Sequence, residues 1–413
     1  MPPLATDLGR YNAPVRILIS AGEASGEMYG AQLIEALHPL EPSLEFFGVG
    51  GERMRAAGCD TVVDAKDLSV VGITEILSHL PKIWGLFHKL IAEADKRKPD
   101  LAIVIDSPAF NWRVARQMKK RGIPVVYYVC PQFWAWRQGR VRLLRKYVDK
   151  ALVIFPFEEE FYRDRGVDAE FVGHPLAELA RPVVTRDEYA AQHGLDAAKP
   201  WITLMPGSRV KEVRMNLPGI LGAAGLLGEV YEFLIPVAPT LDRPLVQTVV
   251  DSHPSKVANG GARLDRVGQE TARTHLVPAA LPALAHSRAG IIASGTATVE
   301  AAMMETPFVM VYRVTPLTYL LGRSTVNVPH FAMVNLIAGD EVVPELVQRD
   351  FTPERVAAEV NKIIPDSEPR QKMLDGLRRV RSLLHGGEQE AHPAERAAGA
   401  VVELLRSRNP GQA

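Results

Sequence analysis

Short apolar runs rich in β-branched residues alternate with stretches of helical periodicity along most of this chain, and this alternation limits the fold more than any other feature. The runs in the first half are residues 15–20, 44–49, 101–106, 124–129 and 151–155. Strands that alternate with helices pair in parallel and are covered by helices on both faces. The sequence therefore predicts the α/β class, with a parallel sheet in the first half.

The same alternation starts again after a stretch rich in proline and charge at residues 176–200. Its runs are residues 201–205, 231–237, 290–293 and 307–312. We therefore expect two doubly wound, Rossmann-like domains that face a central cleft, with ligands at the carboxyl ends of the strands. The expected division is a disordered leader at 1–14, a first domain at 15–180, a second domain at 201–350, and helices at 351–413 that close the second domain or cross between the two.

Composition excludes several classes of protein. The 413 residues include 48 basic and 48 acidic ones, so no overall field would attract nucleic acid or an anionic surface. No apolar stretch is long enough to span a membrane, and the first fourteen residues do not resemble a signal peptide. Two cysteines, Cys59 and Cys130, are too few for a disulfide framework or a cysteine-built metal site, which favours the cytoplasm.

A loop in the second half could bind phosphate. It follows the strand at 201–205 and contains Gly207, Ser208 and Arg209. The planar guanidinium of an arginine suits two-point contact with a phosphate. We therefore include these three residues among the candidate nucleotide-binding residues.

A second such loop follows the strand at 290–293 and contains Ser294, Gly295 and Thr296. Its hydroxyls, its glycine and the free amides at the start of the next helix could together receive a diphosphate. Glu300, in the first turn of that helix, could accept hydrogen bonds from a ribose. The alternative is that a threonine of the loop only caps the helix and that Glu300 only favours its dipole.

In the first domain, the loop at residues 22–27 offers Glu23, Ser25 and Gly26 before a helix expected near Tyr29. Glycines let the backbone approach a ligand closely, so these residues are candidates for the cleft. The Gly-x-Gly-x-x-Gly fingerprint is absent here, which disfavours an NAD-dependent dehydrogenase. A simple turn remains the alternative.

Asp106 is the candidate base. It ends an almost wholly apolar strand, and partial burial at the carboxyl end of such a strand raises the pKa of a carboxyl toward useful base strength. The alternative is an aspartate that caps the next helix. The segment after the following strand contains Trp136 and Arg137, which suit a sugar ring and an anion, although aromatic residues more often belong to a core.

An amphipathic stretch at residues 68–91 could lie at a membrane surface and accept acyl chains. Its candidate contacts are Ile76, Leu80, Ile83, Trp84 and Phe87. The alternative is a helix packed on its own sheet.

These motifs together resemble one family, the lipid-A-disaccharide synthases, from Arg16 to about Gln348. The segments that carry the resemblance are GEASG at 22–26, GITEIL at 72–77, DSPAFN at 106–111, WAWR at 134–137, GHP at 173–175, PGSR at 206–209, SGTATVE at 294–300 and PELVQ at 344–348. The chain departs from the family pattern at Glu27, Cys130 and Val334.

The resemblance implies a GT-B fold, with the acceptor in the first domain and UDP in the second. It implies that UDP-2,3-diacylglucosamine is joined to 2,3-diacylglucosamine 1-phosphate through a β-1,6 bond, at the cytoplasmic face of the inner membrane and in some members as a homodimer. It matches Asp106 to the catalytic aspartate, Arg209 and Asn335 to nucleotide-site residues, and Glu300 to the ribose position.

The residues alone indicate a nucleotide-linked group and a base in a cleft; the resemblance narrows this to an inverting sugar transfer. We expect no metal or other cofactor, since the chain contains no Asp-x-Asp pair, and no covalent intermediate. Two other functions remain open at this point. One is a UDP-sugar 2-epimerase, and the other is a nucleotide-sugar-binding module without catalytic activity.

Overall fold

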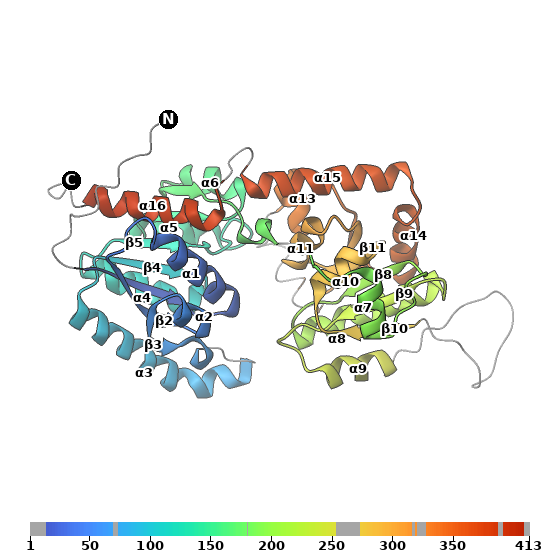
Figure 1. Cartoon of the computed structure of the whole chain (residues 1–413), viewed down its shortest axis with the longest axis horizontal. Helices are drawn as coiled ribbons and strands as arrows, with labels where there is room; N and C mark the ends of the chain where they lie inside the picture. Colours follow the sequence, from blue (N-terminus) through green and yellow to red (C-terminus); the bar gives the residue numbers. More distant parts are fainter. Residues whose placement is uncertain are drawn as a thin grey trace. The chain divides into compact units, whose positions relative to one another are not determined.

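The computed structural model describes residues 14–68, 73–179, 181–252, 273–315, 319, 328–386 and 391–408, without the side chains of Ala24 and of residues 73–80. Two compact units divide the chain (Figure 1). Unit 1 contains the described residues within Met1–Pro175 and His385–Ala413, and unit 2 those within Leu176–Leu384. The leader expected at 1–14 lies outside the described residues except for Pro14.

The described part of unit 1 contains a seven-stranded parallel sheet in the order β3-β2-β1-β4-β5-β6-β7. The strands are β1 (Val15–Ala21), β2 (Leu44–Gly50), β3 (Cys59–Asp64), β4 (Leu101–Ile105), β5 (Val125–Tyr128), β6 (Lys150–Val153) and β7 (Ala169–Phe171). All five residues of β4 are apolar and buried, as expected of a central strand that is covered on both faces.

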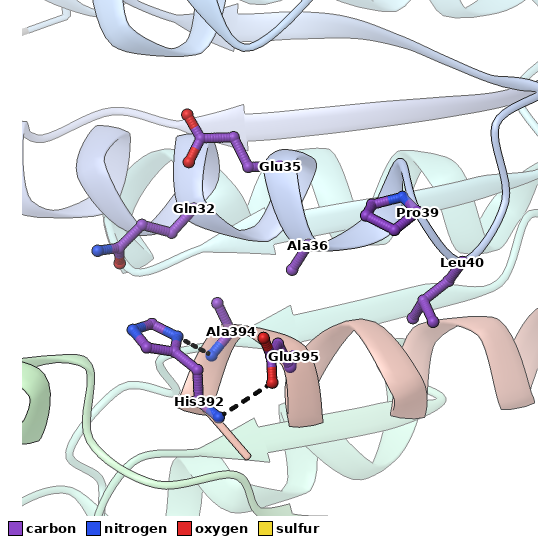
Figure 2. A pocket seen from close by; sticks show the side chains of 8 residues that line it. All are labelled: Gln32, Glu35, Ala36, Pro39, Leu40, His392, Ala394 and Glu395. Atoms are coloured by element: carbon purple, nitrogen blue, oxygen red, sulfur yellow. Dashed lines mark hydrogen bonds between the residues drawn. The ribbon is translucent and has the colours of Figure 1, made fainter.

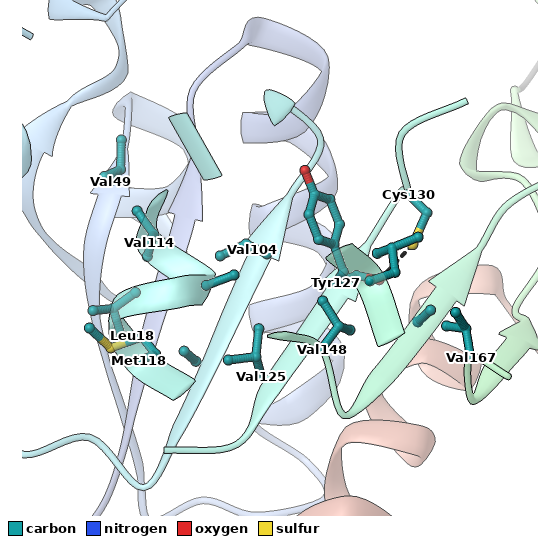
Figure 3. Close-up of a cluster of buried hydrophobic side chains, with 14 of the residues drawn as sticks. Leu18, Val49, Val104, Val114, Met118, Val125, Tyr127, Cys130, Val148 and Val167 are labelled. Atoms are coloured by element: carbon teal, nitrogen blue, oxygen red, sulfur yellow. Dashed lines mark hydrogen bonds between the residues drawn. The ribbon is translucent and has the colours of Figure 1, made fainter. Parts of the chain in front are cut away.

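Helices surround this sheet. They are α1 (Ala24–Leu37), α2 (Glu52–Ala56), α3 (Ile73–Arg97), α4 (Pro108–Lys120), α5 (Val141–Tyr147), α6 (Pro156–Arg163) and α16 (Pro393–Arg408), with 3-10 turns η1 (Ala65–Asp67) and η2 (Gln138–Arg140). The last helix, α16, packs against α1. Figure 3 shows part of the core between sheet and helices, where Leu18 of β1, Val104 of β4 and Val114 of α4 are fully buried.

Unit 2 has a six-stranded parallel sheet, in its described part, in the order β10-β9-β8-β11-β12-β13. Its strands are β8 (Trp201–Met205), β9 (Glu232–Pro236), β10 (Thr274–Val277), β11 (Ala289–Ala293), β12 (Phe308–Tyr312) and β13 (Glu345–Val347). Its helices are α7 (Arg186–His193), α8 (Val210–Leu227), α9 (Arg243–Ser252), α10 (Ala280–His286), α11 (Ala297–Met303), α13 (Met333–Ala338), α14 (Pro353–Ile363) and α15 (Glu368–His385), with the 3-10 turn η3 (Pro175–Glu178) at its start.

Both sheets change winding direction once, and this topology determines where ligands bind. In unit 1, β1 pairs with both β2 and β4; in unit 2, β8 pairs with both β9 and β11. Loops at the carboxyl ends of such strand pairs diverge and leave a crevice for a ligand. The loops after β1, β4, β8 and β11 are therefore the places where side chains can reach a substrate.

The predicted α/β class with two doubly wound sheets is confirmed. Four strands were missed in the sequence, and all four are edge strands: β3, β7, β10 and β13. These edge strands are partly exposed and contain polar residues, so they lack the uninterrupted apolar run that marks a central strand. The central cleft expected between the two domains stays a prediction.

Candidate functional site

The turn after β4 holds the candidate base in a left-handed backbone conformation. Asp106 and Ser107 have φ values of 47° and 45°, which residues other than glycine rarely adopt. The backbone oxygen of Asp106 accepts hydrogen bonds from Asn111 Nδ2 at 2.9 Å and from the Tyr127 hydroxyl at 2.8 Å. The cap position of α4 is Ser107, so the alternative interpretation of Asp106 as a helix cap does not apply.

The carboxyl of Asp106 has the protonation behaviour that a general base needs. Burial, and after it the negative charge of Glu23, raise its pKa to about 6, against a hydrogen bond from the Ser107 backbone that lowers it. Glu23 lies close by, since its Oε1 accepts a hydrogen bond of 3.4 Å from the Ser107 hydroxyl. A base works best when its pKa lies near the working pH, so the environment of Asp106 favours proton abstraction.

The segment at residues 22–27 differs from the expected loop. The helix α1 begins at Ala24, five residues earlier than predicted, with Glu23 as its exposed cap residue and Ser25 exposed in its first turn. A Cβ at Gly22 would lie 2.8 Å from Ser107 Oγ, so a larger residue here would force the Ser107 hydroxyl to move away from its present position between the loops after β1 and β4. Gly26 is buried, with Ile105 as one of its nearest neighbours, which makes it a packing residue.

The departure at Glu27 has a structural explanation. Its Oε1 accepts a hydrogen bond of 2.9 Å from the backbone N–H of Arg53, in the first turn of α2. A Cβ at Gly51 would lie only 2.4 Å from this carboxylate oxygen. The longer side chain of Glu27 therefore fastens α1 to α2.

The aromatic segment after β5 divides into a buried and an exposed half. Trp134 is buried, and its Nε1 donates a hydrogen bond of 2.8 Å to Glu158, a fully buried carboxyl whose pKa is raised to about 7 by burial. Trp136 is 47% exposed, and the guanidinium of Arg137 lies 4.4 Å from the centre of its ring. Of the aromatic residues, Trp136 is therefore the one available to a ligand, together with Arg137.

In unit 2, the loop after β8 binds a carboxylate of the protein itself, that of Glu212 in the first turn of α8. The carboxylate of Glu212 accepts hydrogen bonds from the Ser208 amide at 3.0 Å and the Arg209 amide at 3.3 Å, and it pairs with Arg209 Nη1 at 2.8 Å. Gly207 has a φ of 120°, and a Cβ there would lie 2.5 Å from Glu212 Oε2. Glu212 was not among the predicted residues. Its carboxylate occupies the place of the glutamate in a capping box, but Arg209 at the N-cap has no acceptor for the reciprocal bond.

Three backbone amides of the loop after β11 and the start of α11 have no partner among the described residues. No bond from the amides of Gly295, Thr296 or Ala297 is found within the described ranges, and a Cβ at Gly295 would meet nothing within 4 Å. Consecutive free amides form a concave site for an anion. Behind them, the carboxyl of Glu300 is partly buried, which raises its pKa.

The hydroxyl of Ser294 donates a hydrogen bond of 2.7 Å to the Phe331 carbonyl, which joins this loop to the segment before α13. The amide of Phe331 in turn donates to the Glu345 carboxylate at 2.8 Å. Glu345 therefore holds the segment before α13 that accepts the hydrogen bond of Ser294, a role not expected from the sequence.

Asn335 is fully buried in α13 and makes four hydrogen bonds within the protein. Its Nδ2 donates to the Val343 carbonyl at 2.9 Å and to Glu345 at 2.8 Å, and its Oδ1 accepts from the amides of Val342 and Val343. Its assignment to the nucleotide site stays a prediction. In this structure its amide organises the segment around Glu345.

From Ile73 onward the amphipathic stretch lies in α3, and residues 69–72 lie outside the described part of the chain. The side chains of Ile76 and Leu80 lie outside the described residues, and Ile83 is partly buried. Trp84 is 55% exposed and stacks on Phe87, with 5.6 Å between ring centres. The grouping of Phe87 with the membrane contacts needs correction, because this side chain is only 5% exposed and packs against Phe110 in the core.

A pocket of about 550 Å³ lies between α1 and α16 and includes Gln32, Glu35 and Glu395 in its lining (Figure 2). None of the predicted site residues lines it.

In the described part of the chain, no three His, Cys, Asp or Glu side chains gather to hold a metal ion. Among the described helices, none has the length and apolar character to cross a membrane.

Comparison with known proteins identifies related sequences over nearly the whole chain. The sequence model of a family described as lipid-A-disaccharide synthetase matches residues 17–398. A lipid-A-disaccharide synthase from Koribacter versatilis is 52% identical over 396 residues, which cover 96% of this chain and all of that protein. A protein of the same name from Myxococcus xanthus is 42% identical, over 95% of this chain and 98% of its own length.

Solved structures with the same fold are much more distant in sequence. UDP-GlcNAc 2-epimerase from Neisseria meningitidis has a TM-score of 0.56 and 11% identity, over 95% of this chain and all of that one. MurG from Acinetobacter baumannii has a TM-score of 0.53 and 14% identity, over the same share of each chain. These likenesses concern the fold alone, which occurs here in both glycosyltransferases and epimerases.

Proposed function

This chain belongs to the lipid-A-disaccharide synthase family of glycosyltransferases, and on that premise we propose that Asp106 is the general base of a single, inverting sugar transfer. The observation that carries the proposal is the Asp106 carboxyl at the carboxyl end of β4, with a pKa raised to about 6. Its backbone is fixed by Asn111 and Tyr127, so the side chain leaves the sheet in a defined direction. A positioned base contributes about 10²–10⁴-fold to a rate.

In the proposed reaction, the donor is UDP-2,3-diacylglucosamine and the acceptor is 2,3-diacylglucosamine 1-phosphate. The Asp106 carboxylate takes the proton of the acceptor's 6-hydroxyl while that oxygen forms a bond to the anomeric carbon of the donor. The bond from this carbon to the diphosphate oxygen breaks, and its electron pair leaves with UDP. One displacement inverts the anomeric centre, which gives the β-1,6 bond of the disaccharide 1-phosphate.

Unit 2 would stabilise the departing UDP. The open amides of Gly295, Thr296 and Ala297 are oriented donors for the charge that develops on the diphosphate. Arg209 adds a guanidinium whose side chain is 80% exposed, so a phosphate can replace Glu212 as its partner. Glu300 would accept hydrogen bonds from the ribose hydroxyls. We expect no metal, since these groups already supply fixed positive charge and dipoles.

In unit 1, Glu23 and Ser25 at the start of α1 and the pair Trp136–Arg137 are the proposed acceptor contacts. Ser25, Trp136 and Arg137 are exposed, and Glu23 is close enough to Asp106 to affect its pKa. Gly26 contributes by packing.

Both substrates carry acyl chains, so we also propose contact with the inner membrane through Trp84. Dimer formation belongs to the proposal as well, and light scattering of the purified protein tests it.

The test is mass spectrometry of the products formed from synthetic diacylated donor and acceptor. Wild type should give the disaccharide 1-phosphate and UDP in equal amounts. Asp106→Asn should lose about 10²–10⁴-fold of this activity while it still binds UDP. Turnover close to that of wild type in a folded Asp106→Asn protein would show that another group is the base.

An epimerase is not favoured, because the family match extends over nearly the whole chain. Incubation with the donor alone separates the two functions: an epimerase would convert the donor without an acceptor, whereas a transferase should leave it largely intact.

A further inference from the structure

A second pocket of unit 1, with a volume of about 400 Å³, has three arginines and no acidic residue among its six lining residues. Its lining residues are Gln138, Gly139, Val141, Arg142, Arg145 and Arg165. The first two belong to η2, the next three to α5, and Arg165 follows the end of α6. None of them is among the residues proposed above for the base, the nucleotide or the membrane.

The three arginines of this pocket have no carboxylate partner among the residues that the structure describes. Other cations of unit 1 do: Lys150 pairs with Asp168 at 3.2 Å and with Glu170 at 2.9 Å. Three guanidinium groups that share one concave surface repel one another, and an anion relieves this repulsion. Because the whole chain carries no net charge, this positive potential is a local feature.

At least one of the arginines is held in place. The guanidinium of Arg165 lies 3.8 Å from the centre of the Phe161 ring and donates a hydrogen bond of 2.9 Å to the Phe161 carbonyl. Arg145 lies near the turn after α6. A Cβ added at Gly166, whose φ is 73°, would lie 3.4 Å from Arg145 Cδ. The side chain of Arg165 is therefore restrained while it stays exposed, and binding of an anion costs less side-chain entropy than it would for a free arginine.

We propose that this pocket binds a phosphate ester through Arg142, Arg145 and Arg165. A phosphate has enough oxygen atoms to accept from several guanidinium forks at once, which a single carboxylate does not. Two sources carry this chemistry: the 1-phosphate of the acceptor, and the phosphate headgroup of an anionic lipid. The first source rests on the proposed function, and the binding of phosphate itself does not.

The first experiment tests phosphate binding in the wild-type protein, with inorganic phosphate as the probe. Arginines are labelled with phenylglyoxal, in phosphate or in chloride of equal ionic strength, and the labelled peptides are quantified by mass spectrometry. Labelling of Arg142, Arg145 and Arg165 should fall several-fold in phosphate, while labelling of the exposed Arg116 of α4 should not change. Equal labelling in both salts, or an equal fall at Arg116, overturns the proposal.

The second experiment identifies the source with the triple variant Arg142→Gln, Arg145→Gln, Arg165→Gln. A matched control, Lys98→Gln, Arg116→Gln, Lys120→Gln, removes three exposed charges elsewhere on unit 1. All six side chains are exposed, so neither variant should lose its fold. A KM for the acceptor that rises about tenfold with little change in kcat, in the pocket variant only, assigns the site to the acceptor phosphate.

Vesicle binding tests the second source, the phosphate headgroup of an anionic lipid. Co-sedimentation with vesicles of phosphatidylcholine and phosphatidylglycerol, lost in the pocket variant and kept in the control, assigns the site to a lipid headgroup. If the pocket variant matches the control in both KM and vesicle binding, the pocket takes adventitious anions only and the proposal fails. Loss of all product in the wild type would instead count against the proposed function, and the labelling result would stand.

Discussion

Asn111, one turn into α4, donates a hydrogen bond of 2.9 Å from its side-chain amide to the backbone oxygen of Asp106. The same Nδ2 lies 2.9 Å from the Ile105 carbonyl and 3.2 Å from that of Ser20, and Asn111 Oδ1 accepts from the Ser20 hydroxyl at 2.7 Å. A single buried amide therefore joins the carboxyl ends of β1 and β4. The left-handed turn at Asp106 depends on it, because φ values of this kind persist only where neighbouring contacts enforce them.

Asn111→Ala should therefore weaken both folding and catalysis. Loss of the amide removes the acceptor of the buried Ser20 hydroxyl and a donor to the carbonyls of Ile105 and Asp106, of which Asp106 keeps the Tyr127 hydroxyl. An unsatisfied buried polar group costs roughly 1–3 kcal/mol in the free energy of unfolding. Denaturant titration of Asn111→Ala, Ser20→Ala and the double variant measures the coupling between the two residues. Energies that simply add would contradict a shared network. A fall in kcat beyond that of Ser20→Ala, at a temperature where all variants are folded, would identify Asn111 as a positioning residue.

The pH dependence of activity should reflect Asp106. A base must be deprotonated, so kcat/KM should rise with pH through about 6, the pKa of this carboxyl. The sign for stability is opposite: because the folded-state pKa is raised, the folded protein binds the proton more tightly, and the free energy of unfolding falls as pH rises from about 4 to about 6. Rate profiles and unfolding titrations over this range check both signs.

A substitution of Glu23 tests whether its charge contributes to the raised pKa of Asp106. Its charge raises the pKa of Asp106, so Glu23→Gln should move the acidic limb of the rate profile to lower pH. Glu35, exposed on the same helix and not among the causes of the shift, serves as the control. A limb that stays in place in Glu23→Gln would mean that burial alone sets the pKa of Asp106. An equal shift in Glu35→Gln would mean that the effect is not specific to the charge of Glu23.

Arg209 should act on the donor. Arg209→Gln removes the guanidinium that can leave Glu212 for the diphosphate, and the KM for the donor should rise about tenfold or more, as expected for one or two charge-assisted hydrogen bonds. Arg209→Lys keeps the positive charge but loses the two-point guanidinium contact, so its KM for the donor should lie between those of wild type and Arg209→Gln. Arg214, exposed one turn further along α8, provides the control variant Arg214→Gln. Calorimetric titration with UDP measures the same effect without turnover.

The candidate site residues that follow central strands could be predicted from the sequence. Asp106 and the loops after β8 and β11 follow apolar runs, and parallel topology brings such ends to one edge of each sheet. Glu212 was harder to find, because the capping-box signature has a serine or threonine three residues before the glutamate, where this chain has Arg209.

Other features depended on how the chain folds back on itself. The amide of Asn335 is occupied by Val342, Val343 and Glu345, and nothing in the local pattern of α13 indicates that these partners lie within reach. Trp84 and Phe87 are a further example. They are three residues apart on one helix face, so periodicity treats them alike, and only the contact of Phe87 with Phe110 places one in the core and leaves the other exposed.

This difference decides how membrane contact can be tested. Substitution of Phe87 would damage the core, where loss of a buried phenylalanine costs about 3–5 kcal/mol, so reduced vesicle binding by such a variant would have no clear meaning. Trp84→Glu changes an exposed side chain instead. About half of the ring is available to a bilayer, so vesicle affinity should fall about tenfold, the lower part of the range for a large apolar side chain. Val183, 98% exposed in unit 2, supplies the control Val183→Glu. Flotation with liposomes measures the vesicle binding of both variants. Equal flotation of Trp84→Glu and wild type would remove Trp84 from the proposed membrane contact.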